Sequence, residues 1–342
     1  MPTYNLWRIT LDTNPEDCNL ACTMCEEHSP HSDFMEKLYL ETGVKHRRMP
    51  GEWLEPIFAQ AAKLGVREII PSTMGEPLGY RHFGKIVELC AQHGLLMNLT
   101  TNGTFPGKSA TAWAKLIVPV TSDVKISWNG ATPETAQRVM RGIDFDKAVQ
   151  NVRDFTTIRN RHYELSGHYC RLTFQLTFME NNMHELADII HLAASLGVDR
   201  VKGHHLWAHF EEIKELSFRR NGEAIQRWNQ YVAEAWEAQR DIAARTGKEI
   251  LLENIIPLGP QETAEVPEHY ECPFLGRELW ISATGQYAPC CAPDGQRRTL
   301  GDFGNVQQTS VREVLESEVY QQLLTGYKNI ALCRGCNMRK PV

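Results

Sequence analysis

Strand-like and helix-like segments alternate along the first two thirds of the sequence, and this alternation limits the folds that the chain can adopt. The predicted strands span residues 7–11, 68–71, 95–99, 122–127, 169–178 and 200–206, and the predicted helices between them span 51–64, 82–93, 109–117, 133–157 and 183–196. Strands that are separated by helices pair in parallel and are covered by those helices. Six such units are too few for an eight-stranded barrel, so the sequence predicts an α/β fold built on a partial (β/α)6 TIM-like barrel.

The rest of the chain has a different character. A polar helix is predicted at residues 218–246 and a polar linker at 261–270, and a tail rich in cysteine, glycine and proline follows. The tail has too little apolar content to build a core alone, so we expect metal binding to hold it together. The sequence therefore predicts three parts: a barrel at residues 1–215, a helical linker at 216–265 and a metal-binding module at 266–342.

The ten cysteines of the chain indicate metal binding rather than disulfides. The N-terminus lacks the basic start and apolar run of a signal peptide, and no stretch is apolar enough to span a membrane. We therefore expect a cytoplasmic protein, in which thiols stay reduced. The formal net charge of −6 gives no basic field, so we expect neither a membrane nor nucleic acid as a partner.

Three cysteines lie close together just after the first predicted strand, in the pattern Cys18-x3-Cys22-x2-Cys25. Three thiolates at this spacing can each bind one iron of a cubane [4Fe–4S] cluster, which leaves the fourth iron open to an outside ligand. A zinc site is the alternative, since His28 and His31 are nearby. The spacing favours the cluster, because structural zinc usually takes four ligands from paired cysteine motifs.

This cysteine pattern resembles the signature of the radical S-adenosylmethionine (SAM) superfamily. The resemblance implies that SAM binds the open iron through its amino and carboxylate groups. It also implies that one-electron reduction cleaves SAM to a 5′-deoxyadenosyl radical. The family usually carries an aromatic residue just before the last cysteine, where this chain has Met24. A thioether can still make an apolar contact with the adenine.

Further segments follow the order of the family's SAM-binding segments, and the resemblance extends over essentially the whole chain. The residues that it places against SAM are Gly75, Glu76 and Pro77 after the second strand, Thr101 and Asn102 after the third, Ser127 and Asn129 after the fourth, and Arg141 on the next helix. In the family, the glutamate segment receives the SAM amino group and the arginine faces the carboxylate. A planar guanidinium suits that carboxylate.

The tail carries a second set of cysteines, namely Cys272, Cys290, Cys333 and Cys336. A hairpin is predicted at 278–289 and a helix at 311–324. By spacing alone, a zinc ribbon and an iron–sulfur cluster explain the set equally well. Beside a radical SAM barrel, the tail resembles the Twitch module, a shortened SPASM module, which implies one auxiliary [4Fe–4S] cluster with four cysteine ligands. Cys291 could substitute for Cys290 as a ligand. Because the chain ends soon after Cys336, we expect one auxiliary cluster and not two.

Polar residues line the ends of the fifth and sixth predicted strands, where the mouth of a parallel barrel lies. Arg171, Thr173, Gln175 and Thr177 share one face of the fifth strand, and we expect this face to line the lumen beside cofactor and substrate. The sixth strand ends in Lys202, His204 and His205, each of which could act as a general base. The alternative is a histidine that is hydrogen-bonded beneath the linker helix. Cys90 and Cys170 are expected in the core.

The resemblance to Twitch enzymes implies a small polar substrate of the aminocyclitol, aminoglycoside or sugar type, as in antibiotic biosynthesis. The radical would remove hydrogen from a carbinol carbon. Oxidation to a ketone then needs a base (His204, His205 or Lys202) and an electron acceptor, which the auxiliary cluster would be. Epimerisation instead needs a thiol as hydrogen donor, for which Cys170, Cys291 and Cys90 are available. The base and the acceptor are better placed than the thiols, so we expect oxidation.

Two other classes of function stay open from the sequence. SPASM relatives modify ribosomal peptides, often with a peptide-recognition domain, whereas only 17 residues precede Cys18. That favours a small substrate. A zinc-stabilised binding scaffold is the alternative outside enzymes. For the enzyme, we expect a flavodoxin- or ferredoxin-type electron donor as partner.

Overall fold

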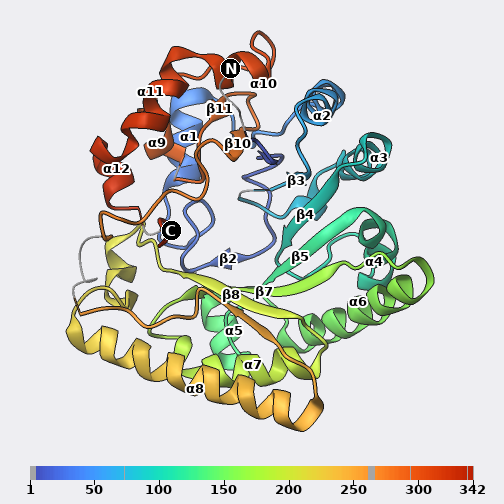
Figure 1. The fold of residues 1–342 in the computed structure, drawn as a ribbon, viewed down its shortest axis with the longest axis vertical. Coiled ribbons are helices and arrows are strands. Elements are labelled where there is room, and N and C mark those ends of the chain that lie inside the picture. The colour runs from blue at the N-terminus through green and yellow to red at the C-terminus, as the bar shows by residue number, and fades with distance from the viewer. Residues whose placement is uncertain (1–4, 73, 261–265, 293, 337, 342) are drawn as a thin grey trace. The chain divides into compact units, whose positions relative to one another are not determined.

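The computed structural model describes residues 5–72, 74–260, 266–292, 294–336 and 338–341, and the chain divides into two compact units. The first unit comprises Met1–Cys18, Glu36–Leu99 and Val266–Val342, and the second comprises Asn19–Met35 and Thr100–Glu265. Figure 1 labels the helices and strands of both units. The predicted tail module thus belongs to the same compact unit as the first strands of the chain.

The strands of the first unit follow the order β11-β10-β1-β3-β4. They are β1 (Arg8–Leu11), β3 (Glu68–Ile70), β4 (Leu96–Thr101), β10 (Glu278–Ile281) and β11 (Tyr287–Ala288). β10 pairs in parallel with β1, with Arg8 beside Glu278, and β11 returns antiparallel to β10. The tail hairpin, which the sequence predicts, therefore extends the sheet that β1 begins.

Two amphipathic helices of the first unit bury an apolar stripe, namely α2 (Leu54–Lys63) and α3 (Phe83–His93). α3 ends at Gly94, which takes a left-handed φ of 65° and donates its N–H to the Cys90 carbonyl. The shorter helices are α1 (Phe34–Thr42), α9 (Asp294–Arg297), α10 (Val311–Glu316), α11 (Glu318–Gly326) and α12 (Ala331–Arg334).

The second unit contains the remaining parallel strands. They run in the order β5 (Thr121–Ser127), β7 (Arg171–Phe178), β8 (Arg200–His205) and β9 (Leu251–Glu253). The helices are α4 (Ala110–Ile117), α5 (Pro133–Val139), α6 (Phe145–Ser166), α7 (Leu186–Ser195) and α8 (Gly222–Thr246), and the long α8 runs beside α7 (Figure 1). β2 (Ala21–Cys22) and β6 (Met140–Arg141) form a separate two-stranded ladder.

The strands of the second unit have one apolar face and one polar face. On the apolar face, Trp128 stacks on Phe174 with ring centroids 4.4 Å apart, and Trp228 of α8 contacts Phe178 at 4.6 Å. The opposite face carries polar residues in matching register, such as Lys125 beside Thr173. The division that strand parity predicts for β7 is therefore confirmed, and both faces are largely buried.

The α/β fold is confirmed, and all six predicted barrel strands are present. The prediction of one continuous helix over residues 133–157 is wrong, because β6 pairs with β2 and separates α5 from α6. The predicted helix at 311–324 is also divided, since Ser317 caps the start of α11. Residues 261–265 of the predicted linker lie outside the described residues. None of the helices that the structure describes combines the length and the apolar character needed to cross a membrane.

Candidate active site and cluster sites

A short ladder in the second unit holds the loop that carries Cys22 and Cys25. β2 pairs with β6, so that Ala21 lies opposite Arg141 and Cys22 lies opposite Met140. Arg141 therefore lies in a strand beside the cysteine loop, and its predicted position on a helix is wrong. Side chains alternate between the faces of a ladder, so the exposed Arg141 side chain leaves the ladder on the face opposite to Cys22.

The turn at Cys25 directs a backbone donor at its sulfur. The Cys25 N–H donates to the Cys22 carbonyl at 3.1 Å, and the Cys25 carbonyl accepts from the Ser29 N–H at 3.3 Å. The N–H of His28 lies 3.5 Å from Cys25 Sγ. An amide donor near sulfur stabilises the charge on a cluster thiolate. Both thiols are only partly buried, so this loop fits a cluster that an outside ligand can reach.

Asn102 connects the end of β4 to the cysteine loop. Its Nδ2 donates to Oδ1 of Asn19, 2.8 Å away, and its Oδ1 accepts from both the N–H and the hydroxyl of Thr104, at 3.0 and 2.6 Å. Asn19 Nδ2 in turn donates to Thr104 Oγ1 at 3.0 Å. Asn102 thus positions the residue that follows Cys18, a role that the sequence analysis did not assign to it.

In the first unit, Gly75 and Glu76 lie against the backbone that leads into Cys18. Gly75 has a φ of 72°, and a Cβ at this position would lie 2.3 Å from the Asn14 carbonyl oxygen. The Glu76 N–H donates to the Asp17 carbonyl at 2.7 Å. Only glycine allows this close approach of two loops, so Gly75 fixes the path of the chain just before the first cysteine.

Several predicted SAM contacts are part of the local hydrogen bonding of their own loops. Thr101 and Asn129 are each 2% exposed. Thr101 also has the strand parity of the buried residues of β4. Thr101 supports the turn that follows it, whereas Asn129 accepts a bond from β7. The Leu78 N–H donates to Glu76 Oε1 at 3.2 Å, and this bond caps the turn that begins at Pro77. The Gly103 N–H donates to Thr101 Oγ1 at 3.4 Å, and the Thr177 N–H donates to Asn129 Oδ1 at 2.9 Å.

Four polar residues form a row across the strands of the second unit. Ser127 pairs with Gln175, Gln175 with Lys202, and Lys202 with Glu253. Neighbouring strands lie about 4.8 Å apart, so the row is continuous from the predicted SAM contact Ser127 to β9. His204 lies one level nearer the carboxyl ends of the strands. We call Ser127, Gln175, Lys202 and Glu253 the polar row.

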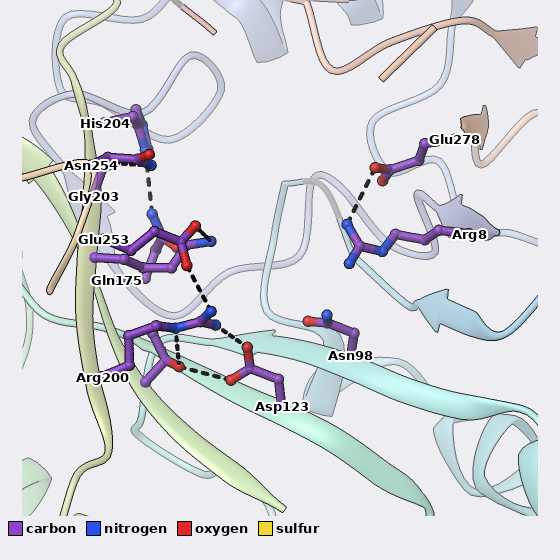
Figure 2. Close-up of polar contacts among 12 residues, drawn as sticks. Arg8, Asn98, Asp123, Gln175, Arg200, Gly203, His204, Glu253, Asn254 and Glu278 are labelled. Atoms are coloured by element: carbon purple, nitrogen blue, oxygen red, sulfur yellow. Dashed lines mark hydrogen bonds and ion pairs between the residues drawn. The ribbon is translucent and has the colours of Figure 1, made fainter. Parts of the chain in front are cut away.

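Partly buried ion pairs connect the polar row to the residues beside it on the same strands. Figure 2 shows Arg200 between two carboxylates: it bonds Glu253 Oε2 at 2.7 Å and also pairs with Asp123. Thr173 Oγ1 accepts from Arg200 Nε at 3.1 Å and donates to Asp123 Oδ1 at 2.8 Å. Lys202 Nζ reaches Glu253 Oε1 at 3.2 Å. Two cations and two carboxylates balance in charge, which makes their partial burial tolerable.

The candidate bases differ in environment. Burial, together with the Lys202 charge, lowers the pKa of His204 to about 4. This ring is therefore neutral at pH 7, and its Nδ1 lies 3.4 Å from Gln175 Nε2. Burial lowers the pKa of Lys202, while Glu253 acts in the opposite direction. His205 lies on the apolar face, with its ring centroid 4.9 Å from that of Trp228 in α8. It therefore does not face the polar row, and the prediction that it could act as the base is not supported.

The four tail cysteines lie together in the first unit. Burial raises the pKa of the Cys290 thiol to about 12, and the charges of Cys336, Cys272 and Cys333 act in the same direction. Thiols that influence one another in this way fit a cubane, in which each thiolate binds its own iron. Among the described residues, no three His, Cys, Asp or Glu side chains surround a single metal position.

Two of the remaining thiols, Cys90 and Cys170, are buried. Burial raises the pKa of Cys90 in α3 and of Cys170 before β7 to about 12. Cys170 precedes the apolar residue Leu172 by two positions, so it has the parity of the apolar face, as predicted. Cys291 is partly buried beside Cys290, and loss of contact with water raises its pKa well above the usual value. Met24, the predicted adenine contact, is partly buried in the cysteine loop.

Three polar residues of these sites were not identified from the sequence. Glu253 lies on β9, a strand too short to stand out in the sequence pattern. Asn254 follows it with a φ of 63°, and its Nδ2 donates to the Gly203 carbonyl at 2.9 Å. Glu278 begins β10 and pairs with Arg8. A charged residue at the start of an otherwise apolar strand was the available signal for Glu278.

Comparison with known proteins identifies two families. A model of the radical SAM superfamily matches residues 15–193, more than half of the chain, and a model of the SPASM iron–sulfur cluster-binding domain matches residues 272–337. The chain is 25% identical over 303 residues to the PqqA peptide cyclase of Methylocella silvestris, which covers 87% of this chain and 70% of that protein.

Solved structures show the same fold. SuiB of Streptococcus suis bound to S-adenosylmethionine has a TM-score of 0.66 at 15% identity, covering 98% of this chain and 72% of that chain. The protein anSMEcpe with bound AdoMet has a TM-score of 0.66 at 16% identity, covering 97% and 88%. The matched SPASM region contains all four tail cysteines, and an iron–sulfur cluster at this position excludes the zinc-stabilised scaffold.

The chain belongs to the radical SAM superfamily, with a SPASM/Twitch-type C-terminal domain, and its cofactors are S-adenosylmethionine and two iron–sulfur clusters.

Proposed function

We propose that this enzyme removes a hydrogen atom from a carbinol carbon of a small polar substrate and oxidises that carbon to a ketone. The observation that carries the proposal is the continuous polar row from Ser127 to Glu253, with a neutral histidine, His204, one level above it. An aminocyclitol, aminoglycoside or sugar offers the hydroxyl and amino groups that such a surface can bind.

The proposal assigns the cofactors to residues by sequence pattern and local geometry. Cys18, Cys22 and Cys25 would hold the SAM-binding cluster, with Gly75, Asn102 and Arg141 shaping its surroundings. Cys272, Cys290, Cys333 and Cys336 would hold the auxiliary cluster. When bound, these groups supply the 5′-deoxyadenosyl radical that takes the hydrogen atom and an acceptor for one electron. An external flavodoxin- or ferredoxin-type protein would deliver the reducing electron.

The residues of the polar row would bind and orient the substrate. Oxidation of a carbinol releases a hydrogen atom, a proton and an electron, so one group must accept the proton. His204 is neutral at pH 7, and its Nδ1 lone pair, which faces the Gln175 amide, would accept the proton once the substrate hydroxyl replaces that amide as its partner. The Lys202–Glu253 pair offers a donor and an acceptor to the substrate hydroxyl and amino groups. Cys170 lies on the opposite face, which disfavours it as the hydrogen donor of an epimerase.

An anaerobic assay in heavy water tests the reaction, with a panel of aminocyclitols, aminoglycosides and free sugars as probes. A ketone that forms together with 5′-deoxyadenosine, without carbon-bound deuterium, supports oxidation. An isomer of the substrate that gains one deuterium contradicts it. In that case Cys291→Ala and Cys170→Ala identify the donor, because loss of the donor converts the product to a ketone.

The proposed base is tested with the same assay. We expect His204→Gln to lower ketone formation about a hundredfold, the usual effect of a lost general base. His184→Gln is the matched control, because His184 has a side chain that is 46% exposed. Equal activity of the His204→Gln variant and the wild type would remove His204 from the mechanism and leave Lys202 as the candidate.

A second candidate function is the modification of a peptide. The relative named a peptide cyclase covers 87% of this chain, and SuiB has been solved with a precursor peptide. The polar row can equally bind serine, lysine or glutamate side chains. The test is 5′-deoxyadenosine formation with synthetic peptides encoded beside the gene. A peptide product two hydrogens lighter, with no turnover of the sugar panel, would favour this candidate.

A further inference from the structure

A buried carboxylate lies where the tail hairpin joins β1. Glu278, 3% exposed, begins β10 and faces Arg8 of β1 in register. Its Oε1 accepts a hydrogen bond from Thr10 Oγ1 at 2.7 Å, and its Oε2 lies 3.3 Å from Arg8 Nη1, as Figure 2 shows for the Arg8 contact. Glu278 is thus held in one position by two neighbours on β1.

Arg8 shares its charge between two carboxylates. Its Nη2 lies 2.6 Å from Glu68 Oε2, closer than Nη1 lies to Glu278. Asn98 Nδ2 donates a further bond to Glu68 Oε2 at 3.0 Å. Arg8 therefore contacts both carboxylates, and its contact with Glu278 is the longer of the two.

The same hairpin brings Glu278 close to the tail cysteines. β10 and β11 pair Trp280 with Ala288, and two residues further along each arm lie Glu278 and Cys290. These residues are therefore at the same end of the hairpin.

We infer that the Arg8–Glu278 pair sets the reduction potential of the auxiliary cluster. This inference rests on the proposed assignment of Cys272, Cys290, Cys333 and Cys336 as its ligands. Reduction adds one negative charge to the cluster. A buried carboxylate nearby opposes that charge and a partly buried guanidinium favours it, and both charges are screened less than they would be at the surface. The pair would adjust how readily the cluster accepts the electron that substrate oxidation releases.

The experiment is a redox titration of the full-length holoenzyme, followed by electron paramagnetic resonance. The auxiliary signal is the one that persists in the Cys18→Ala/Cys22→Ala/Cys25→Ala variant and does not change when SAM is added. We expect Glu278→Gln to favour reduction at least threefold, a rise of about 28 mV for one electron. Arg8→Met should shift the potential in the opposite direction, and Arg8→Lys, which keeps the charge, should leave it near the wild-type value.

Glu68→Gln is the matched control, because Glu68 contacts the same Arg8 but is not part of the hairpin. Its shift should be smaller than that of Glu278→Gln. Shifts of one sign for Glu278→Gln and Arg8→Met, or equal shifts for both glutamate variants, would overturn the inference. Absence of any auxiliary signal from the triple alanine variant would instead contradict the proposed ligand assignment, which separates the two failures.

Discussion

Gly75 shows at the scale of one residue how backbone geometry can determine a cofactor site. Its left-handed φ and its contact with the Asn14 carbonyl leave no room for a Cβ. We predict that Gly75→Ala destabilises the protein by about 1–3 kcal/mol through strain and lowers the iron content of the first cluster. Gly65→Ala is the control, since Gly65 has a φ of 77° but no atom within 4 Å of the added Cβ. Equal melting temperatures and iron contents for the two variants would contradict this role.

His205 leads to a prediction about pH. Burial lowers its pKa to about 3, its ring packs between Phe178 and Trp228, and its Nδ1 is buried without a hydrogen-bond partner. Between pH 6.5 and 3 the unfolded chain binds a proton that the folded chain excludes. The free energy of unfolding therefore decreases as the pH is lowered, by up to about 1.4 kcal/mol per pH unit. His205→Phe should reduce the loss of stability between pH 7.5 and 5.5, as measured by urea denaturation. If the pH dependence of stability were the same in the His205→Phe variant and the wild type, His205 would have to be exposed to water in the folded protein.

Individual elements of the barrel could be predicted from the sequence to different degrees. Most of the six main strands were predictable because they are rich in apolar and β-branched residues and are bounded by turn signals, whereas β8, with the sequence RVKGHH, contains only one such residue. β9 and β6 were not predictable, because strands of two or three residues exist only through their partners, β8 and β2. Glu253 and the strand position of Arg141 were missed for this reason. The polar face of β7 was predictable from parity alone, whereas its ion pairs depend on β9.

The two faces of β7 should respond differently to substitution. Gln175→Ala removes one member of the polar row, and we expect at least a tenfold loss of turnover with little change in stability. Leu172→Ala removes a fully buried side chain from the apolar face and should cost about 2–5 kcal/mol of stability. Its activity per folded molecule should remain. Urea denaturation and 5′-deoxyadenosine formation separate the two effects, and a Gln175→Ala variant with wild-type turnover would argue against a role for this face.

At the scale of the whole molecule, the sequence was least informative about how distant parts of the chain pair with one another. The tail was predicted as a separate module because its composition changes at the polar linker. In the structure, β10 pairs with β1, so residues far apart in the chain share one compact unit. Neither composition nor periodicity encodes which strand a distant hairpin joins. The cysteine spacings, read together with the resemblance to radical SAM enzymes, predicted two iron–sulfur clusters without any knowledge of that pairing.

Two independent cluster sites lead to a prediction about iron content. The reconstituted enzyme should contain about eight irons per chain, as expected for two [4Fe–4S] clusters. Replacing Cys18, Cys22 and Cys25 by Ala should remove about half of them and abolish SAM cleavage, because the other ligands all lie in the tail. Cys333→Ala/Cys336→Ala should remove the other half and also lower the melting temperature, since the tail depends on its cluster to stay folded. Cys90→Ala is the control, because this thiol is buried in α3 and should leave the iron count unchanged. If the first triple variant lost all its iron while remaining folded, the seven cysteines would have to serve one shared site, and the assignment of an electron acceptor in the tail would fail with it.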